Sequence, residues 1–310
     1  MRDLSLRHLK LISSYSTRHA VRGGAGLVYL LLALFFSLIV AQAVLTPVEA
    51  MINTEKKAGR EADPVVIVEQ VVDFGRGVVT WALSPDTEGA GEEEQERIDA
   101  EMDVWSNYLL DDNPALLSAI FLILLFGMPL VLPFGAFNQT AGEIGNRGLR
   151  YMLLRTERDN IFFGRFVSTV LFTLIVNAFA IATITLYVGL KLKIYGGWEL
   201  TAWAMHGYVA LSLQALPYIA LCAWISAMNE GGMLSMVVCS FAIGGVVLFA
   251  FLAAKLWGPA HYIDWLLPWN AHNDLIHHNF KHVLRGGLIC VAYTAAYLFL
   301  GQRYFSKRDL

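Results

Sequence analysis

Long apolar stretches alternate with short polar segments along most of the chain. Six of these stretches contain almost no Asp, Glu, Lys or Arg, and each is about 17 to 25 residues long, the length of a helix that crosses a bilayer core roughly 30 Å thick. The pattern therefore predicts an all-α membrane protein with six transmembrane helices. We expect these helices at residues 26–46, 115–136, 166–190, 203–227, 233–255 and 286–302.

The composition supports this fold class. Of the 310 residues, 56% are hydrophobic and 16% are charged, whereas soluble domains are about 25% charged. Cys222, Cys239 and Cys290 all lie within predicted spans, which favours roles in packing over disulfide bonds. No basic stripe is joined to aromatic residues on a polar face, so the pattern does not indicate nucleic-acid binding.

Polar segments between the predicted spans complete the layout. Residues 1–22 are expected to form an amphipathic helix on the membrane surface, with a disordered basic tail as the alternative. Residues 47–113 form a long acidic loop that contains 17 of the 26 acidic residues. Residues 137–165 form a second polar segment, residues 256–285 are expected to form a helical hairpin, and residues 303–310 form a basic tail.

The distribution of lysine and arginine predicts the orientation. Placing both termini in the cytoplasm puts 13 of the 23 basic residues into the shorter set of loops, as the positive-inside rule requires. Residues 137–165 are then cytoplasmic, whereas the 47–113 loop and the 256–285 hairpin are extracytoplasmic. We expect a multi-pass protein of the cell inner (plasma) membrane.

Several spans contain prolines or uncharged polar residues. Pro129 lies in the second predicted span and Pro217 in the fourth, where neighbouring groups must satisfy the carbonyls that each proline frees. Asn177 and Gln214 also lie within spans, and we expect them to form hydrogen bonds between helices. The predicted spans contain no carboxylate, which disfavours an ion-coupled carrier.

The polar segment after the second span is the strongest candidate for function. It is expected to form a short amphipathic helix at the inner membrane face, which a cytosolic partner could grip. Anchoring by positive charge alone is the alternative. The residues expected to face the membrane are Leu149, Met152, Leu153 and Thr156, and those expected to face the cytosol are Arg147, Arg150, Glu157 and Arg158.

This segment resembles the intracellular coupling region of ABC-2 type ABC transporter permeases. In that family an acidic residue precedes a Gly-containing turn, a Leu-Leu pair, a basic stretch and a Gly-Lys pair that opens the third span. Those places are taken here by Glu143, Gly148, Leu153-Leu154, Arg155 to Arg158, and Gly164-Arg165. The six-span layout and the basic ending Phe305–Leu310 are also similar to the family.

The resemblance implies a transport subunit that is not itself an enzyme. ATP and Mg²⁺ would be bound by a separate ABC ATPase subunit, and the permease would pair with a second copy or another permease in the lipid bilayer, usually for export. The sequence contains no G-x-x-x-x-G-K-[ST] phosphate-binding loop, in keeping with this reading. The residues expected to couple to the ATPase are Glu143, Arg147, Arg150, Tyr151, Arg155 and Arg158.

Two alternatives rest on other parts of the chain. His272, His277, His278 and His282 lie within eleven residues, and the four-residue spacing of the last two would suit Zn²⁺ or another divalent metal on one helix face. This cluster could serve a metal-dependent membrane enzyme or a metal- or pH-sensing loop, or its histidines could simply lie at the interface. Alternatively, the chain could be a membrane anchor whose 47–113 segment docks an extracytoplasmic protein.

Overall fold

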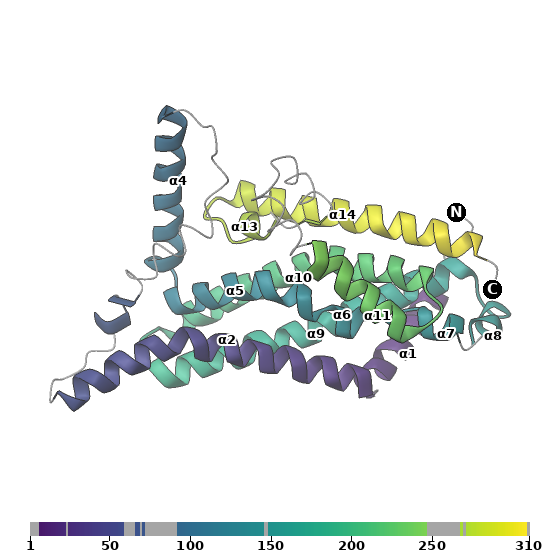
Figure 1. Ribbon diagram of the computed structural model, residues 1–310, viewed down its shortest axis with the longest axis horizontal. Helices are drawn as coiled ribbons and strands as arrows, with labels where there is room; N and C mark the ends of the chain where they lie inside the picture. Colours follow the sequence, from purple (N-terminus) through teal and green to yellow (C-terminus); the bar gives the residue numbers. More distant parts are fainter. Residues whose placement is uncertain are drawn as a thin grey trace.

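The structure, a computed structural model, is a bundle of α-helices. It describes residues 6–22, 24–58, 66–68, 70–71, 92–145, 148–246, 267–268 and 271–308, and none of these residues is in a strand. Figure 1 shows the long helices lying side by side along the longest axis of the molecule. The predicted all-α fold class is therefore confirmed for the described residues.

Four of the helices are long and apolar enough to cross a bilayer. They are α2 (Gly24–Lys57), α9 (Arg158–Leu192), α10 (Gly197–Met228) and α14 (Phe280–Lys307). Helix α10 packs against both α9 and α14, and α2 packs against α9. These helices contain the first, third, fourth and sixth predicted spans, so the chain is a multi-pass membrane protein.

The second predicted span forms a bent element. Helix α5 (Ala115–Val131) is followed by the short helix α6 (Pro133–Ala136) and is preceded by α4 (Glu92–Leu110). Residues Met102–Leu110 are bent by 113° from α5, and the two together would count as a fifth, broken span. The described residues thus support four to five spans.

The fifth predicted span, 233–255, is described only in its first part. It begins as α11 (Gly232–Ser240) and continues as one π-helical turn, η1 (Phe241–Gly245). Residues 247–266 lie outside the described residues, and they include the first eleven residues of the predicted 256–285 hairpin. The arrangement with six spans therefore stays a prediction.

Several helices extend past the predicted boundaries. Helix α2 continues to Lys57 instead of ending at residue 46, α9 begins at Arg158 instead of 166, and α14 begins at Phe280 instead of 286. Hydropathy marks the part of a helix that suits hydrocarbon, whereas the helix itself continues through polar residues whose backbone bonds form equally well in water. The first part of the predicted 47–113 loop is therefore helical.

The N-terminal helix α1 (Leu6–Arg22) packs against the first part of α9 through small residues. Ser13 and Ser16 are buried, and the Thr17 and Ser168 hydroxyls lie 3.1 Å apart. Leu11 and Tyr15 are 60% and 70% exposed, so part of the apolar surface of α1 faces away from the bundle. The position of this helix on the membrane surface stays a prediction.

A buried glutamine compensates for the proline in α5. Pro129 has no N–H, so the carbonyl of Leu125 lacks the donor that the helix would otherwise supply. Gln214 on α10, which is buried, donates from Nε2 to that carbonyl at 2.9 Å. The expected interhelical hydrogen bond of Gln214 is confirmed, whereas that of Asn177, also buried, stays a prediction.

We predict that Gln214→Leu destabilises the bundle by about 1–2 kcal/mol, because it leaves the Leu125 carbonyl without its donor. In a Pro129→Ala background the restored N–H can bond to Leu125, so the same substitution should cost much less. Thermal unfolding of the four proteins in mild detergent measures this double-mutant cycle. An equal loss of stability in both backgrounds would contradict the proposed compensation.

Candidate functional site

Two short helices at one end of the bundle form the predicted coupling segment. They are α7 (Ala141–Gly145) and α8 (Leu149–Leu153), which connect α6 to α9 (Figure 1). The expectation of one amphipathic helix through residue 158 is wrong, because α8 ends at Leu153 and Arg158 already belongs to α9. A Cβ at Gly145 would lie 2.1 Å from the Glu230 carbonyl oxygen, so only glycine allows this close approach.

Helix α7 is fastened to both α9 and α10. Ser226 Oγ on α10 accepts hydrogen bonds from the backbone N–H groups of Thr140 at 2.9 Å and Ala141 at 3.0 Å. Glu143 forms an ion pair with Arg165, which lies near the start of α9. Both contacts are partly or fully buried, so α7 cannot move far without moving the ends of these two long helices.

The second short helix has a buried side and an exposed side. Leu149 is buried in a cluster with Phe162 and Phe305, and Met152 and Leu153 pack against the same cluster. From the sequence, these residues are expected to face the membrane. They face the bundle instead, because it offers them an apolar cluster. Tyr151 and Leu154 are 77% and 83% exposed, and Arg155 is also exposed. Together these three side chains form what we call the exposed tip.

Arg158 connects the start of α9 to the end of α14. Its Nη1 donates to the carbonyl oxygens of Ser306 at 3.0 Å and Arg308 at 2.6 Å. Arg308 in turn donates to the Ala227 carbonyl at 2.6 Å and pairs with Glu230 at 2.9 Å. Carbonyls that no longer have a partner at a helix C-terminus attract a cation, which explains these bonds. That Arg158 lies on the cytosolic side stays a prediction.

The structure thus brings Glu143, Tyr151, Arg155 and Arg158 to one end of the bundle. Arg147 and the side chain of Arg150 lie outside the described residues. Sequence reasoning did not assign roles to Ser226, Glu230 or Arg308. The pattern offered little sign of them, because a serine in a span and a charge in a turn are common features with many roles.

At the opposite end, three histidine rings lie close together, and one of them contacts a tryptophan. The rings of His278 and His282 lie 4.2 Å and 4.1 Å from that of His277, and the Trp105 ring of α4 lies 4.7 Å from it. Trp105 also donates from Nε1 to the Ile276 carbonyl at 3.2 Å. We call His277, His278 and His282 the histidine cluster.

Neighbouring contacts fix this end of the bundle. His272, on the short helix α13 (Ala271–Leu275), packs its ring against Phe126 of α5 at 4.0 Å. His206 of α10 donates from Nε2 to the Leu275 carbonyl at 3.0 Å. Asp274 lies 3.6 Å from His282 and 3.8 Å from Arg285. The described part of the connection before α14 is therefore packed onto α4, α5 and α10.

The histidine cluster has the geometry of packed rings. His277 and His282 stack with an angle of 21° between their planes, which directs their nitrogens sideways instead of toward a common point. The backbone N–H of Asn279 donates to His277 Nδ1 at 3.0 Å, so that nitrogen is unprotonated. Among the described residues, no three His, Cys, Asp or Glu side chains are placed to hold a metal ion.

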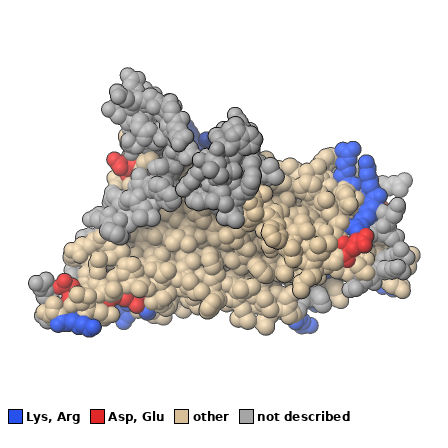
Figure 2. Space-filling model, viewed as in Figure 1, with Lys and Arg blue, Asp and Glu red and all other residues tan. Residues whose placement is uncertain are grey.

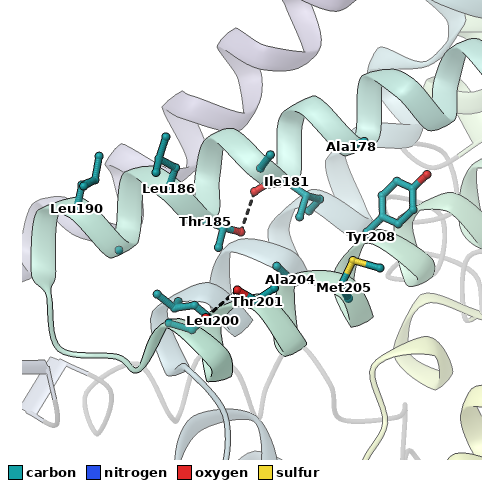
Figure 3. A pocket seen from close by; sticks show the side chains of 13 residues that line it. Ala178, Ile181, Thr185, Leu186, Leu190, Leu200, Thr201, Ala204, Met205 and Tyr208 are labelled. Atoms are coloured by element: carbon teal, nitrogen blue, oxygen red, sulfur yellow. Dashed lines mark hydrogen bonds between the residues drawn. The ribbon is translucent and has the colours of Figure 1, made fainter.

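An apolar groove runs between α9 and α10 near the turn that connects them. It has a volume of about 640 Å³, and its described lining carries no charged side chain (Figure 3). The hydroxyl of Thr185 donates to the Ile181 carbonyl and that of Thr201 to the Gly197 carbonyl, so both are used within their own helices. The groove suits hydrocarbon and offers no reactive group.

Comparison with known proteins adds no family assignment: no protein-family model matches the chain, and no curated protein sequence matches it.

We predict that the histidine cluster makes the protein less stable in acid. Burial, and then the neighbouring His278 and His282, lower the pKa of His277 to about 4, whereas an unfolded histidine titrates near 6.5. Between these values the unfolded chain binds more protons, so the free energy of unfolding should fall as the pH is lowered from 6.5 toward 4.

Thermal unfolding in detergent between pH 7 and pH 4.5 measures this dependence, and His277→Gln should make it shallower. His8→Gln is the matched control, because His8 is exposed at the other end of the molecule. A pH profile that His277→Gln leaves unchanged, or that His8→Gln alters equally, would contradict the assignment to this cluster.

Proposed function

We propose that the chain is the membrane-spanning permease subunit of an ATP-driven transporter of the ABC-2 type. The observation that carries this proposal is the α7–α8 segment, which is anchored to the bundle on one side and exposes Tyr151, Leu154 and Arg155 on the other. Such a surface suits a partner that pushes on the bundle. The sequence contains no phosphate-binding loop, so in this proposal the partner binds ATP and Mg²⁺.

The anchoring contacts offer a route for mechanical coupling. A displacement of the exposed tip would pass to α9 through the Glu143–Arg165 pair and to α10 through Ser226. Arg158 would pass the motion of α9 on to the end of α14. Packed helices tend to shift between discrete arrangements, so a small push can become an opening.

In this proposal the α7–α8 end and both termini are cytoplasmic, and the transporter contains two permeases and two ATPases in the inner membrane. The end with α4 and α13 is then extracytoplasmic. Its contacts, such as the hydrogen bond from Trp105 to Ile276, would keep that end closed. Export would require α4 and α13 to separate.

The alternative functions have less support. The stacked geometry of the histidine cluster weighs against a metal-dependent enzyme built on these residues. Part of the 47–113 segment is integrated into the bundle, since Trp105 and Leu109 of α4 belong to its core. That integration weighs against a membrane anchor that presents the segment as a separate domain to an extracytoplasmic partner.

The test is to purify the tagged chain from native membranes in mild detergent and identify its partners by mass spectrometry. We expect a stoichiometric protein that carries a Walker A motif and hydrolyses ATP. The double variant Tyr151→Ala with Leu154→Ala should lower its recovery about tenfold or more, because exposed aromatic and apolar anchors carry much of the energy of an interface.

Trp198→Ala is the matched control, since Trp198 is 82% exposed at the opposite end of the bundle and should leave recovery unchanged. Recovery of no ATPase from native membranes would overturn the proposal. If the tip and control variants reduce recovery of the ATPase equally, the α7–α8 segment is not part of the interface.

A further inference from the structure

A second cleft lies between α10 and α14, at the end of the bundle that also holds α7 and α8. Its volume is about 460 Å³, comparable with the apolar groove between α9 and α10. Unlike that groove, this cleft combines basic and apolar side chains. The residues that line it are Trp224, Leu300, Arg303, Tyr304, Lys307 and Arg308.

The basic side chains in this cleft differ in whether they already have an anionic partner. Arg308 is already used, because it pairs with Glu230 and donates to the Ala227 carbonyl. Arg303 and Lys307 are exposed, and within the described part of the chain neither forms an ion pair. Figure 2 shows Lys and Arg side chains gathered at the end of the molecule where α14 finishes. Two cations are therefore free to meet an anion.

The apolar side of the cleft lies toward the middle of the bundle. Leu300, Arg303 and Lys307 follow one another at helical spacing, so they occupy one face of α14. Trp224 of α10 is half-buried beside this face, and its ring lies 6.2 Å from that of Tyr297 in a stacked arrangement. The cleft thus changes from cationic at the helix end to apolar along the span.

We propose that this cleft binds an anionic phospholipid. Arg303 and Lys307 hold the phosphate, and one acyl chain lies along Leu300 and Trp224. The polarity of the cleft matches the boundary between headgroups and hydrocarbon, and basic pockets between membrane helices suit anionic headgroups. The inference requires only a membrane-spanning chain and does not depend on the proposed transport function.

The same helix provides a natural comparison at its other end. A cleft of equal volume, about 460 Å³, is lined there by Lys281, Arg285 and apolar residues that include Leu288. The carboxylate of Asp274 lies 3.8 Å from Arg285 and offsets part of its charge. This cleft therefore has the size for a lipid but a weaker attraction for an anionic one.

Binding of single lipids is measured by native mass spectrometry of the full chain in detergent, titrated with dimyristoyl phosphatidylglycerol or phosphatidylcholine. We expect the first phosphatidylglycerol to bind more tightly than phosphatidylcholine. Each cation near an anionic surface raises affinity roughly fivefold. Arg303→Gln with Lys307→Gln should therefore weaken that binding about 25-fold.

Two further double variants test whether the effect comes from the charges themselves and from their position on α14. Arg303→Lys with Lys307→Arg keeps both charges and should retain the preference for phosphatidylglycerol. Lys281→Gln with Arg285→Gln removes two cations from the other end of α14 and should leave the tight site intact.

Equal affinity for the two lipids would overturn the proposal. An equal loss of phosphatidylglycerol affinity in Arg303→Gln with Lys307→Gln and in Lys281→Gln with Arg285→Gln would overturn it as well. If Arg303→Gln with Lys307→Gln keeps the lipid site but releases a copurified protein, the cleft is a protein interface instead.

Discussion

Every backbone N–H and C=O group within hydrocarbon must find its partner inside the protein, because no water is there to replace it. This constraint explains why the described spans are helices, and it also explains where polar side chains stand between them. Proline in α5 removes one donor, and Gln214 of α10 replaces it at the Leu125 carbonyl. The two helices are thereby joined by a buried hydrogen bond at the position of the proline.

The two ends of the bundle are held by different forces. At the α7–α8 end, ion pairs and charge-assisted hydrogen bonds connect short segments to α9, α10 and α14. Examples are the Glu143–Arg165 pair and the bonds of Arg158 to the end of α14. At the other end, the rings of Trp105 and the histidine cluster contact one another and join α4 to the segment before α14. Polar contacts depend on direction and can be exchanged, whereas stacked rings hold as long as they stay uncharged.

The basic cleft and the tie through Arg158 share the last turns of α14. Arg308 takes part in both features: its side chain lines the cleft, and its carbonyl oxygen accepts a hydrogen bond from Arg158. A lipid bound beside Arg303 would therefore stabilise the helix end to which α9 is tied. In the proposed transporter this would couple the lipid environment to the position of the α7–α8 segment.

Much of this protein could be predicted from sequence alone. Apolar length and charge distribution determined its helical, membrane-spanning character and the positions of α2, α9, α10 and α14, because these properties depend only on local composition. The polar partners could not be predicted in this way. These contacts depend on the packing of segments at least 80 residues apart in the sequence. They are the bond of Gln214 to Leu125, the bonds of Arg158 to the end of α14, and the bonds of Ser226 to the start of α7. Hydropathy also could not show that Leu149 faces the bundle or that the histidines stack, since a helix face gains its meaning only from the neighbour that packs against it.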